Sequence, residues 1–191
     1  MKRTALLMAA AALLVSGCSK PSSFTTGNIV MAKDGEGDAN LGDTIRTYFF
    51  DATVNSAYLT DSYKSITPSS DDKELPVVNI TVKNTTGSAI TMYDTDFQGQ
   101  WGDEGDDDYC LPVTFDGYDA IENMLPAEYV LKVGQSETGD LVYEMPTGRS
   151  DFSVSYKEWF ADGSSGNVFF IFFSAEMMLV NKSKAPHRAE A

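Results

Sequence analysis

The chain has 191 residues, of which 42% are hydrophobic and 12% aromatic, so its composition is that of a folded protein and not of a disordered one. Its 28 acidic side chains outnumber its 14 basic ones and give a net charge of −14. Such a surface repels phosphate backbones, which excludes nucleic acid as a partner.

The segment before residue 18 is organised like a secretory signal peptide. Lys2 and Arg3 come first, an apolar run follows from Ala5 to Val15, and small residues precede Cys18. The apolar run is shorter than the roughly 20 residues that a membrane-spanning helix needs. We therefore predict a signal peptide over residues 1–17. Its removal leaves 12 basic against 28 acidic side chains, a net charge of −16.

The stretch from Leu14 to Cys18 reads Leu-Val-Ser-Gly-Cys and resembles the lipobox of bacterial lipoproteins. The resemblance implies that the thiol of Cys18 receives diacylglycerol, so Cys18 is the expected site of lipid attachment. Two or more acyl chains, at about 0.8 kcal/mol per buried methylene, give a stable anchor. We expect the mature protein on the extracytoplasmic face of the cell membrane. A soluble secreted protein with an incidental cysteine is the alternative.

Cys110 has no partner within the chain if Cys18 is lipidated, because the sequence contains two cysteines. We expect Cys110 to be a buried small apolar residue. A reactive thiol is the alternative, although the only histidine is His187, near the C-terminus.

The mature chain is predicted to have a flexible tether, one folded domain and a tail. Ser, Thr, Gly, Lys and Asp dominate residues 18–40, which favours the tether. We expect a single domain over residues 41–181, since a chain of this length supports one core, and a polar tail over residues 182–191.

Period-two alternation of apolar residues predicts strands within the domain. The clearest strand spans residues 75–83, where Val78, Ile80 and Val82 share the face expected to be buried. Further strands are expected over residues 48–55, 89–101, 109–115, 128–133, 139–145, 152–159 and 168–173. Turn residues recur between them, which favours an all-β antiparallel sandwich. Tyr118, Ile121 and Leu125 precede Pro126 at a spacing that predicts one short helical turn.

Several of these segments resemble a domain-of-unknown-function family that is common in Gram-positive extracytoplasmic lipoproteins. The resemblance is carried by residues 41–44, 50–56, 78–84, 131–136, 139 and 141–146. It covers roughly residues 41–175 apart from an acidic loop, and Val133 stands where the family often has proline. The resemblance implies an immunoglobulin-like β-sandwich, similar to a small secreted mycobacterial antigen, and its motifs contain no catalytic residue.

The acidic loop is the one local feature with metal-binding chemistry. Its carboxylates are Asp103, Glu104, Asp106, Asp107 and Asp108. Calcium takes oxygen ligands in flexible geometry, so a calcium site here is one hypothesis. A loop without a ligand, in which like charges repel one another, is the alternative. No other cofactor is expected.

The sequence contains none of the usual catalytic constellations. A Ser-His-Asp or Cys-His arrangement needs a histidine beside the nucleophile, and His187 lies in the predicted tail. Residues 134–139 and 70–73 match the nucleophile elbow and the S-x-x-K motif in appearance or spacing only. We therefore predict a non-catalytic binding or envelope-interaction module whose partner is an envelope protein or a glycan. The alternatives are a calcium-binding or calcium-stabilised surface domain and a protease inhibitor.

Replacement of Cys18 by Ser should move the protein from the membrane fraction to the soluble fraction, because the acyl chains lose their attachment atom. Immunoblotting of fractionated cells measures this change, with Cys110→Ser as the matched control that stays in the membrane. Mass spectrometry that finds no acyl chain on Cys18 would contradict the lipobox prediction.

Overall fold

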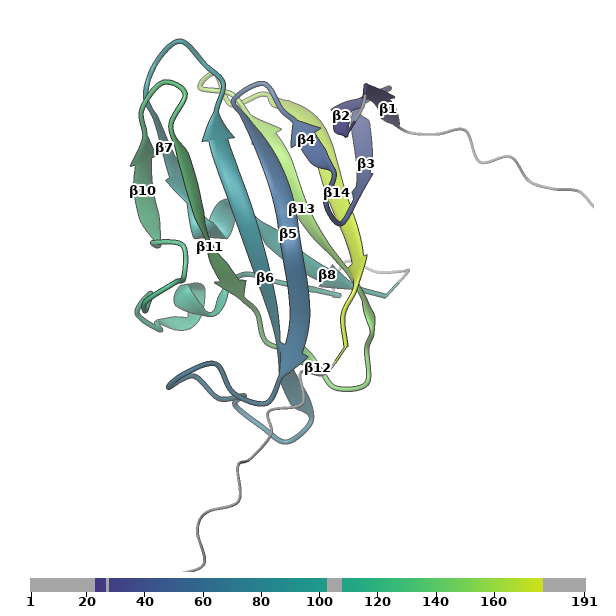
Figure 1. The fold of residues 1–191 in the computed structure, drawn as a ribbon, viewed down its shortest axis with the longest axis vertical. Coiled ribbons are helices and arrows are strands. Elements are labelled where there is room, and N and C mark those ends of the chain that lie inside the picture. The colour runs from purple at the N-terminus through teal and green to yellow at the C-terminus, as the bar shows by residue number, and fades with distance from the viewer. Residues whose placement is uncertain (1–22, 27, 103–107, 177–191) are drawn as a thin grey trace, which may run out of the picture.

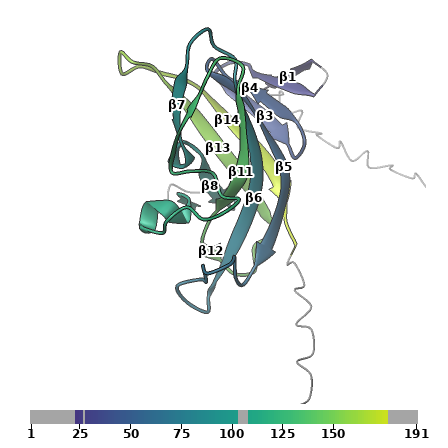
Figure 2. The ribbon, with the colours of Figure 1, turned by 60° about the vertical axis from the view of Figure 1, so that its left-hand side comes forward.

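Alternating apolar residues form the two longest strands of the protein, β5 (Phe50–Thr60) and β6 (Lys73–Asn84), which pair antiparallel. The computed structural model describes residues 23–26, 28–102 and 108–176. In it, the sheet that contains β5 and β6 packs against a second sheet (Figures 1 and 2). The predicted all-β sandwich is therefore confirmed.

The first sheet has the strand order β1–β2–β4–β5–β6–β11, and β12 also pairs with β6. Neighbouring strands run antiparallel except β2 and β4, which are parallel. The remaining strands of this sheet are β1 (Ser23–Thr26), β2 (Ile29–Ala32), β4 (Thr44–Arg46), β11 (Ser136–Val142) and β12 (Met145–Pro146).

The second sheet has the order β3–β14–β13–β8–β9, and here β3 and β14 are the parallel pair. Its strands are β3 (Glu36–Asn40), β14 (Ser165–Ser174), β13 (Asp151–Trp159), β8 (Gln98–Trp101) and β9 (Tyr109–Cys110). A separate ribbon pairs β7 (Ile90–Tyr93) with β10 (Glu128–Leu131). The described helices are the short 3-10 turns η1 (Asp94–Asp96) and η2 (Val113–Asp116).

The main hydrophobic core lies between the two sheets. The predicted core residues Val78, Ile80 and Val82 of β6 are fully buried, which confirms the predicted inward face. They belong to one cluster with Val154 of β13 and Ile171 of β14. This shared core holds the second sheet in a fixed position against the first.

A β-bulge between Val54 and Ser56 changes which residues of β5 face the core. Before the bulge the even-numbered residues Ala52 and Val54 are buried in the main cluster. After it the odd-numbered residue Leu59 is buried there. The inserted residue, Asn55, is exposed and donates hydrogen bonds to Asn79 and Thr81 at 2.9 Å. The bulge therefore keeps β5 amphipathic along its whole length.

A second, smaller hydrophobic cluster covers the outer face of the first sheet at one end. There Leu75 and Val77 are fully buried, although they point away from the main core. Tyr63 and Ile66 of the β5–β6 loop and Met124 pack over them. Val77 lies on the face of β6 opposite Val78, Ile80 and Val82, and this loop is the reason that the residue is buried.

Polar side chains form a hydrogen-bonded ladder over the rest of that outer face. Thr81 and Thr138 are 2.8 Å apart, and the Asn79 amide donates to Asp140 at 2.7 Å. Asp140 also accepts a hydrogen bond from the Tyr63 hydroxyl at 2.8 Å. Burial, and then this hydrogen bond, raise the pKa of Tyr63 above its ordinary value. The ladder joins β5, β6 and β11 to the loop that covers the second cluster.

The folded part begins earlier than the sequence predicts. Residues 29–32 and 36–40 form β2 and β3, and β1 pairs with β2, so the predicted tether over residues 18–40 is wrong for this part. Small and acidic residues are tolerated there because only Val30, Gly37 and Ala39 need burial. A side chain on Gly37 would meet the Phe169 ring at 2.7 Å. Residues 18–22 and the predicted tail over 182–191 lie outside the described residues.

The predicted helical turn is displaced along the chain. Residues 113–116 form η2, whereas residues 118–125 contain no helix, and the strand predicted over 109–115 is confined to β9. The strand predicted over 89–101 divides at η1, so its two halves join different sheets. Within the described part of the chain, no helix is long and apolar enough to cross a membrane.

Truncation of Ile80 to Ala should lower the free energy of unfolding by about 2–5 kcal/mol, because it leaves a cavity between the sheets. Denaturant unfolding followed by circular dichroism measures the loss. The control is Thr91→Ala at an exposed position of β7, which should change stability by less than about 0.5 kcal/mol. Equal stability of the two variants would contradict the assigned core.

Candidate functional site

A groove runs along the outer face of the second sheet, and its floor is made by serines of β13. Phe152, Val154 and Tyr156 alternate with Ser153 and Ser155, so the serines point away from the core. Each serine is only 6% exposed even though it lies on an outer face. Larger side chains from the neighbouring strands shield them on both sides.

The strand register arranges those larger side chains in rows across the sheet. Ser155 is aligned with Gln98 of β8 on one side and with Phe170 of β14 on the other. Ser153 is aligned in the same way with Gln100 and Phe172. The floor is therefore bounded by a wall of amides on β8 and a wall of aromatic rings on β14. We call this arrangement the serine groove.

The aromatic wall is regular and open to solvent. The rings of Phe170 and Phe172 lie 6.0 Å apart with planes 23° from parallel. Phe172 is 45% exposed, a large fraction for a phenylalanine on a strand in the interior of a sheet. Exposed apolar side chains gathered in this way mark binding surfaces more often than isolated ones do.

Two cavities that share Gln100 follow the groove. The larger, of about 640 Å³, extends past Phe172 to Leu41, Arg149 and Asp151. The smaller, of about 280 Å³, extends past Phe170 to Trp159. At about 3.3 Å per residue, β13 gives the groove a length of roughly 26 Å, and two strand spacings give it a width of roughly 10 Å. These dimensions suit one extended polymer chain.

Charged groups stand at the ends of the groove. Near one end the Lys157 ammonium lies 4.8 Å from the centre of the Trp159 ring, which is 60% exposed. At the other end the hydroxyls of Ser174 and Ser150 donate to Asp151 and hold the pKa of that carboxyl below its ordinary value. The middle of the groove presents uncharged amide, hydroxyl and aromatic groups.

The two serines of the groove floor are hydrogen-bonded to neutral acceptors on β8. The Ser153 hydroxyl donates to the Gln100 amide oxygen at 3.3 Å, and the Ser155 hydroxyl donates to the Gln98 carbonyl at 3.4 Å. Neither of these partners is a base that could remove a proton. Burial raises the pKa of Cys110, next to the core, to about 12, so its thiol is not a nucleophile at neutral pH.

The 3-10 turn η1 carries two carboxyl groups, of which Asp96 lines the smaller cavity and Asp94 does not. Asp94 is 2% exposed and accepts a hydrogen bond from the Thr114 hydroxyl, while its Oδ1 atom is buried without a hydrogen-bond partner in the described part of the chain. Asp96 accepts the Tyr93 amide proton at 2.8 Å and lines the cavity. Burial raises the pKa of both carboxyls above the ordinary value.

The residues singled out in the sequence lie mostly outside this site. Cys18, Asp103, Glu104, Asp106 and Asp107 lie outside the described residues. Asp108 is described, and its carbonyl accepts the Trp101 amide proton at 3.1 Å. Across residues 23–26, 28–102 and 108–176, no three His, Cys, Asp or Glu side chains group in a way that could hold a metal ion. The calcium hypothesis stays a prediction.

Sequence reasoning missed the serine groove, although one signal of it was visible. The continuous apolar run over residues 168–173 has aromatic side chains on both faces of its strand. A strand in the centre of a sheet, covered on both faces, has the same pattern. Which neighbours flank Ser153 and Ser155 depends on the pairing of β13 with β8 and β14. The pairing of β13 with β8 joins segments more than 50 residues apart, for example Ser155 and Gln98.

A comparison with protein families identifies the class of this fold. Residues 39–167 match the family described as "Domain of unknown function (DUF4352)". The match spans more than half of the chain, so the protein belongs to this family. No match was found among curated proteins.

The solved structures to which this chain is similar include proteins of Bacillus subtilis and Clostridium difficile. The ycdA protein of Bacillus subtilis, described as a candidate lipoprotein, is 17% identical with a TM-score of 0.54; the match covers 69% of this chain and 38% of that one. The yjhA protein of Bacillus subtilis is 16% identical with a TM-score of 0.47, covering 70% and 97%. An uncharacterised β-sandwich protein of Clostridium difficile is 12% identical with a TM-score of 0.39, covering 74% and 98%. At this identity the first of these shows a shared fold alone.

Replacement of Asp94 by Asn should flatten the pH dependence of stability. A carboxyl whose pKa is raised by folding favours folding below its ordinary pKa near 3.8, and that contribution is lost as the pH rises through the raised value. The free energy of unfolding of the variant should therefore rise relative to that of the natural protein as the pH increases from about 4 to about 7. Urea unfolding across this range measures the gain.

The control for this prediction is Asp119→Asn, on an exposed stretch of chain. It should leave the pH dependence unchanged. An Asp94→Asn difference that is constant from pH 4 to pH 7, or that favours the natural protein as pH rises, would contradict the prediction.

Proposed function

We propose that this protein is an extracytoplasmic lipoprotein, anchored through Cys18, that binds a glycan chain of the cell envelope in the serine groove without transforming it. The observation that carries the proposal is the groove itself: an uncharged floor of serines between a wall of amides and a wall of exposed aromatic rings.

The chemistry of the groove favours a glycan over a peptide strand. A peptide that adds to a sheet needs free backbone donors and acceptors at an edge. In β13 the backbone is paired on both sides, with β8 and with β14, so only side chains reach a ligand. Amides and hydroxyls bond to sugar hydroxyls, and the rings of Phe170 and Phe172 offer flat apolar contact to sugar rings.

Charge supports a ligand with little negative charge. The chain carries −14 overall, so a polyanion would be repelled at long range. Within the groove Lys157 and Asp96 line one cavity and Arg149 and Asp151 line the other, so each cation is accompanied by a carboxylate. An uncharged or weakly charged polysaccharide meets both conditions.

Anchoring supports the same function. A tethered domain has a raised effective concentration toward partners in the envelope, so a modest affinity for each glycan segment suffices. The ycdA protein, of similar fold, is also described as a candidate lipoprotein. Neither calcium binding nor protease inhibition is favoured by any described feature, and both stay predictions from the sequence.

Replacement of Ser155 by Leu should block the groove floor and lower glycan affinity at least tenfold, equivalent to about 1.4 kcal/mol. Replacement of Phe172 by Ala should lower it by a similar factor through lost ring contact. The ligands are insoluble peptidoglycan, tested by co-sedimentation, and tetra-N-acetylglucosamine, tested by titration calorimetry.

The matched control is Ser56→Leu, which adds the same side chain at an exposed position of β5, on the first sheet. It should bind like the natural protein. If folded Ser155→Leu and Phe172→Ala variants still bind the glycan, the serine groove is not the binding site. Turnover of the oligosaccharide that persists through purification would show that the protein is an enzyme.

A further inference from the structure

We infer that one end of the sandwich, formed by the β4–β5 turn, the β13–β14 hairpin and the β10–β11 turn, rests against the lipid head groups of the bilayer. The inference deepens the proposed function, because it rests on the anchor at Cys18 and adds the surface through which the domain meets the membrane. We call this region the aromatic end and define it by Tyr48, Phe49, Phe160 and Val133.

The strand register shows where the chain enters the domain. Ser23 of β1 is aligned with Ala32 of β2, and Met31 of β2 with Arg46 of β4, directly before the turn that carries Tyr48. The chain therefore enters at the level of the aromatic end. In Figure 1 its first described strand lies beside β2 near the top of the sandwich.

Chain length then limits how far this end can be from the membrane. Five residue steps separate Cys18 from Ser23, and a fully extended chain spans at most about 3.5 Å per residue. The lipid anchor thus lies within roughly 17 Å of β1. The opposite end is too far away, because β6 alone, at about 3.3 Å per residue, is roughly 36 Å long.

The aromatic end carries the side chains that favour a bilayer interface. Tyr48 is 70% exposed, and its ring packs edge-on against Phe160 at 5.4 Å and Phe49 at 5.2 Å between centroids. Val133 is 61% exposed at the neighbouring turn. Aromatic rings with a polar group, such as tyrosine, are enriched at the level of lipid head groups.

The turns that carry these residues are held firmly in position. The Tyr48 amide donates to the buried Glu158 carboxylate at 2.7 Å, and the Asn167 amide donates to the same group at 2.8 Å. The Asn84 amide donates to the Gln135 carbonyl at 3.0 Å and ties the β10–β11 turn to β6. The exposed Tyr48 ring and the half-buried Phe49 and Phe160 rings therefore form a preformed surface.

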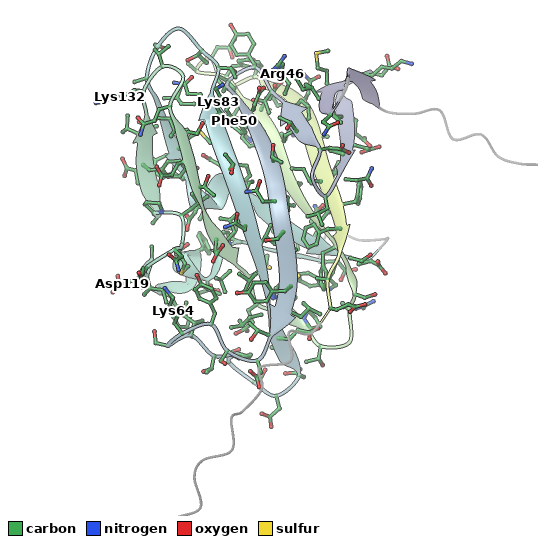
Figure 3. The ribbon with its side chains drawn as sticks, viewed as in Figure 1. Arg46, Phe50, Lys64, Lys83, Asp119 and Lys132 are labelled. Atoms are coloured by element: carbon green, nitrogen blue, oxygen red, sulfur yellow. The ribbon has the colours of Figure 1, made fainter. Side chains whose placement is uncertain are left out.

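The distribution of charge also favours an orientation with the aromatic end toward the bilayer. Figure 3 shows Arg46, Lys83 and Lys132 near the aromatic end, and Lys64 and Asp119 toward the other end. Arg46 is paired with Asp51, whereas Lys83 and Lys132 are exposed. The loop at the far end exposes Asp61, Asp71 and Asp72, which anionic head groups would repel. The β13–β14 hairpin at the aromatic end also exposes Asp162, so the contrast between the two ends lies in Lys83 and Lys132 against the acidic far loop.

Site-specific quenching in vesicles tests the orientation. Val133→Cys and Ser65→Cys each receive a fluorophore in the acylated full chain, at the aromatic end and in the far loop respectively. Cys110 is expected to stay unlabelled because its pKa is about 12, and unsubstituted protein checks this. The vesicles contain phosphatidylethanolamine and phosphatidylglycerol, with a nitroxide quencher on the lipid head group.

We expect at least threefold stronger quenching at Val133→Cys than at Ser65→Cys. Tyr48→Ser should halve the quenching at the aromatic end while the protein stays on the vesicles. The matched control is Tyr118→Ser, which removes an exposed tyrosine outside the aromatic end and should change nothing. Equal quenching at the two labels, or stronger quenching at Ser65→Cys, would overturn the orientation.

Flotation of the same vesicles separates this inference from the proposed anchor. Protein that is acylated and floats, yet shows no preferential quenching at Val133→Cys, disproves the membrane-facing end and leaves the anchor intact. Protein that carries no acyl chain and does not float disproves the anchor, and the orientation with it. Loss of glycan binding in the groove variants bears on neither result.

Discussion

The antiparallel pairing of β5 with β6 is the constraint on which both hydrophobic clusters of this protein depend. The inner faces of the two strands supply Ala52, Val54 and Ile80 to the main core, against which the second sheet packs. The outer face of β6 supplies Leu75 and Val77 to the second cluster. A change in the register of this pair would move apolar side chains to the opposite face, so the position of every other element follows from it.

The serine groove is a consequence of that packing. Phe152 and Val154 must face the first sheet, which turns the intervening Ser153 outward, and the same alternation turns Phe170 and Phe172 outward on β14. Small residues on one strand between large residues on its neighbours create a channel without any special loop. The ligand surface and the core are therefore opposite faces of the same strands, which makes the groove as rigid as the sandwich.

Under the proposed anchoring through Cys18, the early start of the fold limits how the domain can be oriented at the membrane. A tether extending to residue 40 would let the domain take any orientation, whereas strands from residue 23 leave only a short connection to Cys18. With the aromatic end at the bilayer, β13 extends away from it, and the serine groove runs outward from Trp159 toward Asp151. Such an arrangement presents the groove to polymers that lie above the membrane.

Much of the architecture could be predicted from the sequence, because alternation is a local property. Val78, Ile80 and Val82 were assignable to the core by spacing alone, and the turn residues between strands indicated a sandwich. The lipobox residues indicated an anchor, and the family resemblance agreed with the match over residues 39–167. Local patterns failed where burial came from elsewhere in the chain: the loop that covers Val77, and the partners that draw residues 29–40 into the sheets.

The sequence by itself determined the fold class, the acidic surface and the expected lipid attachment at Cys18, since each depends on residue type and short-range spacing. Only the tertiary structure decided the serine groove and the aromatic end. Both depend on the pairing of distant segments, Gln98 with Ser155 in the groove and Tyr48 with Phe160 at the end. Pairing of this kind is set by the packing of the whole core, which no local pattern of residues encodes.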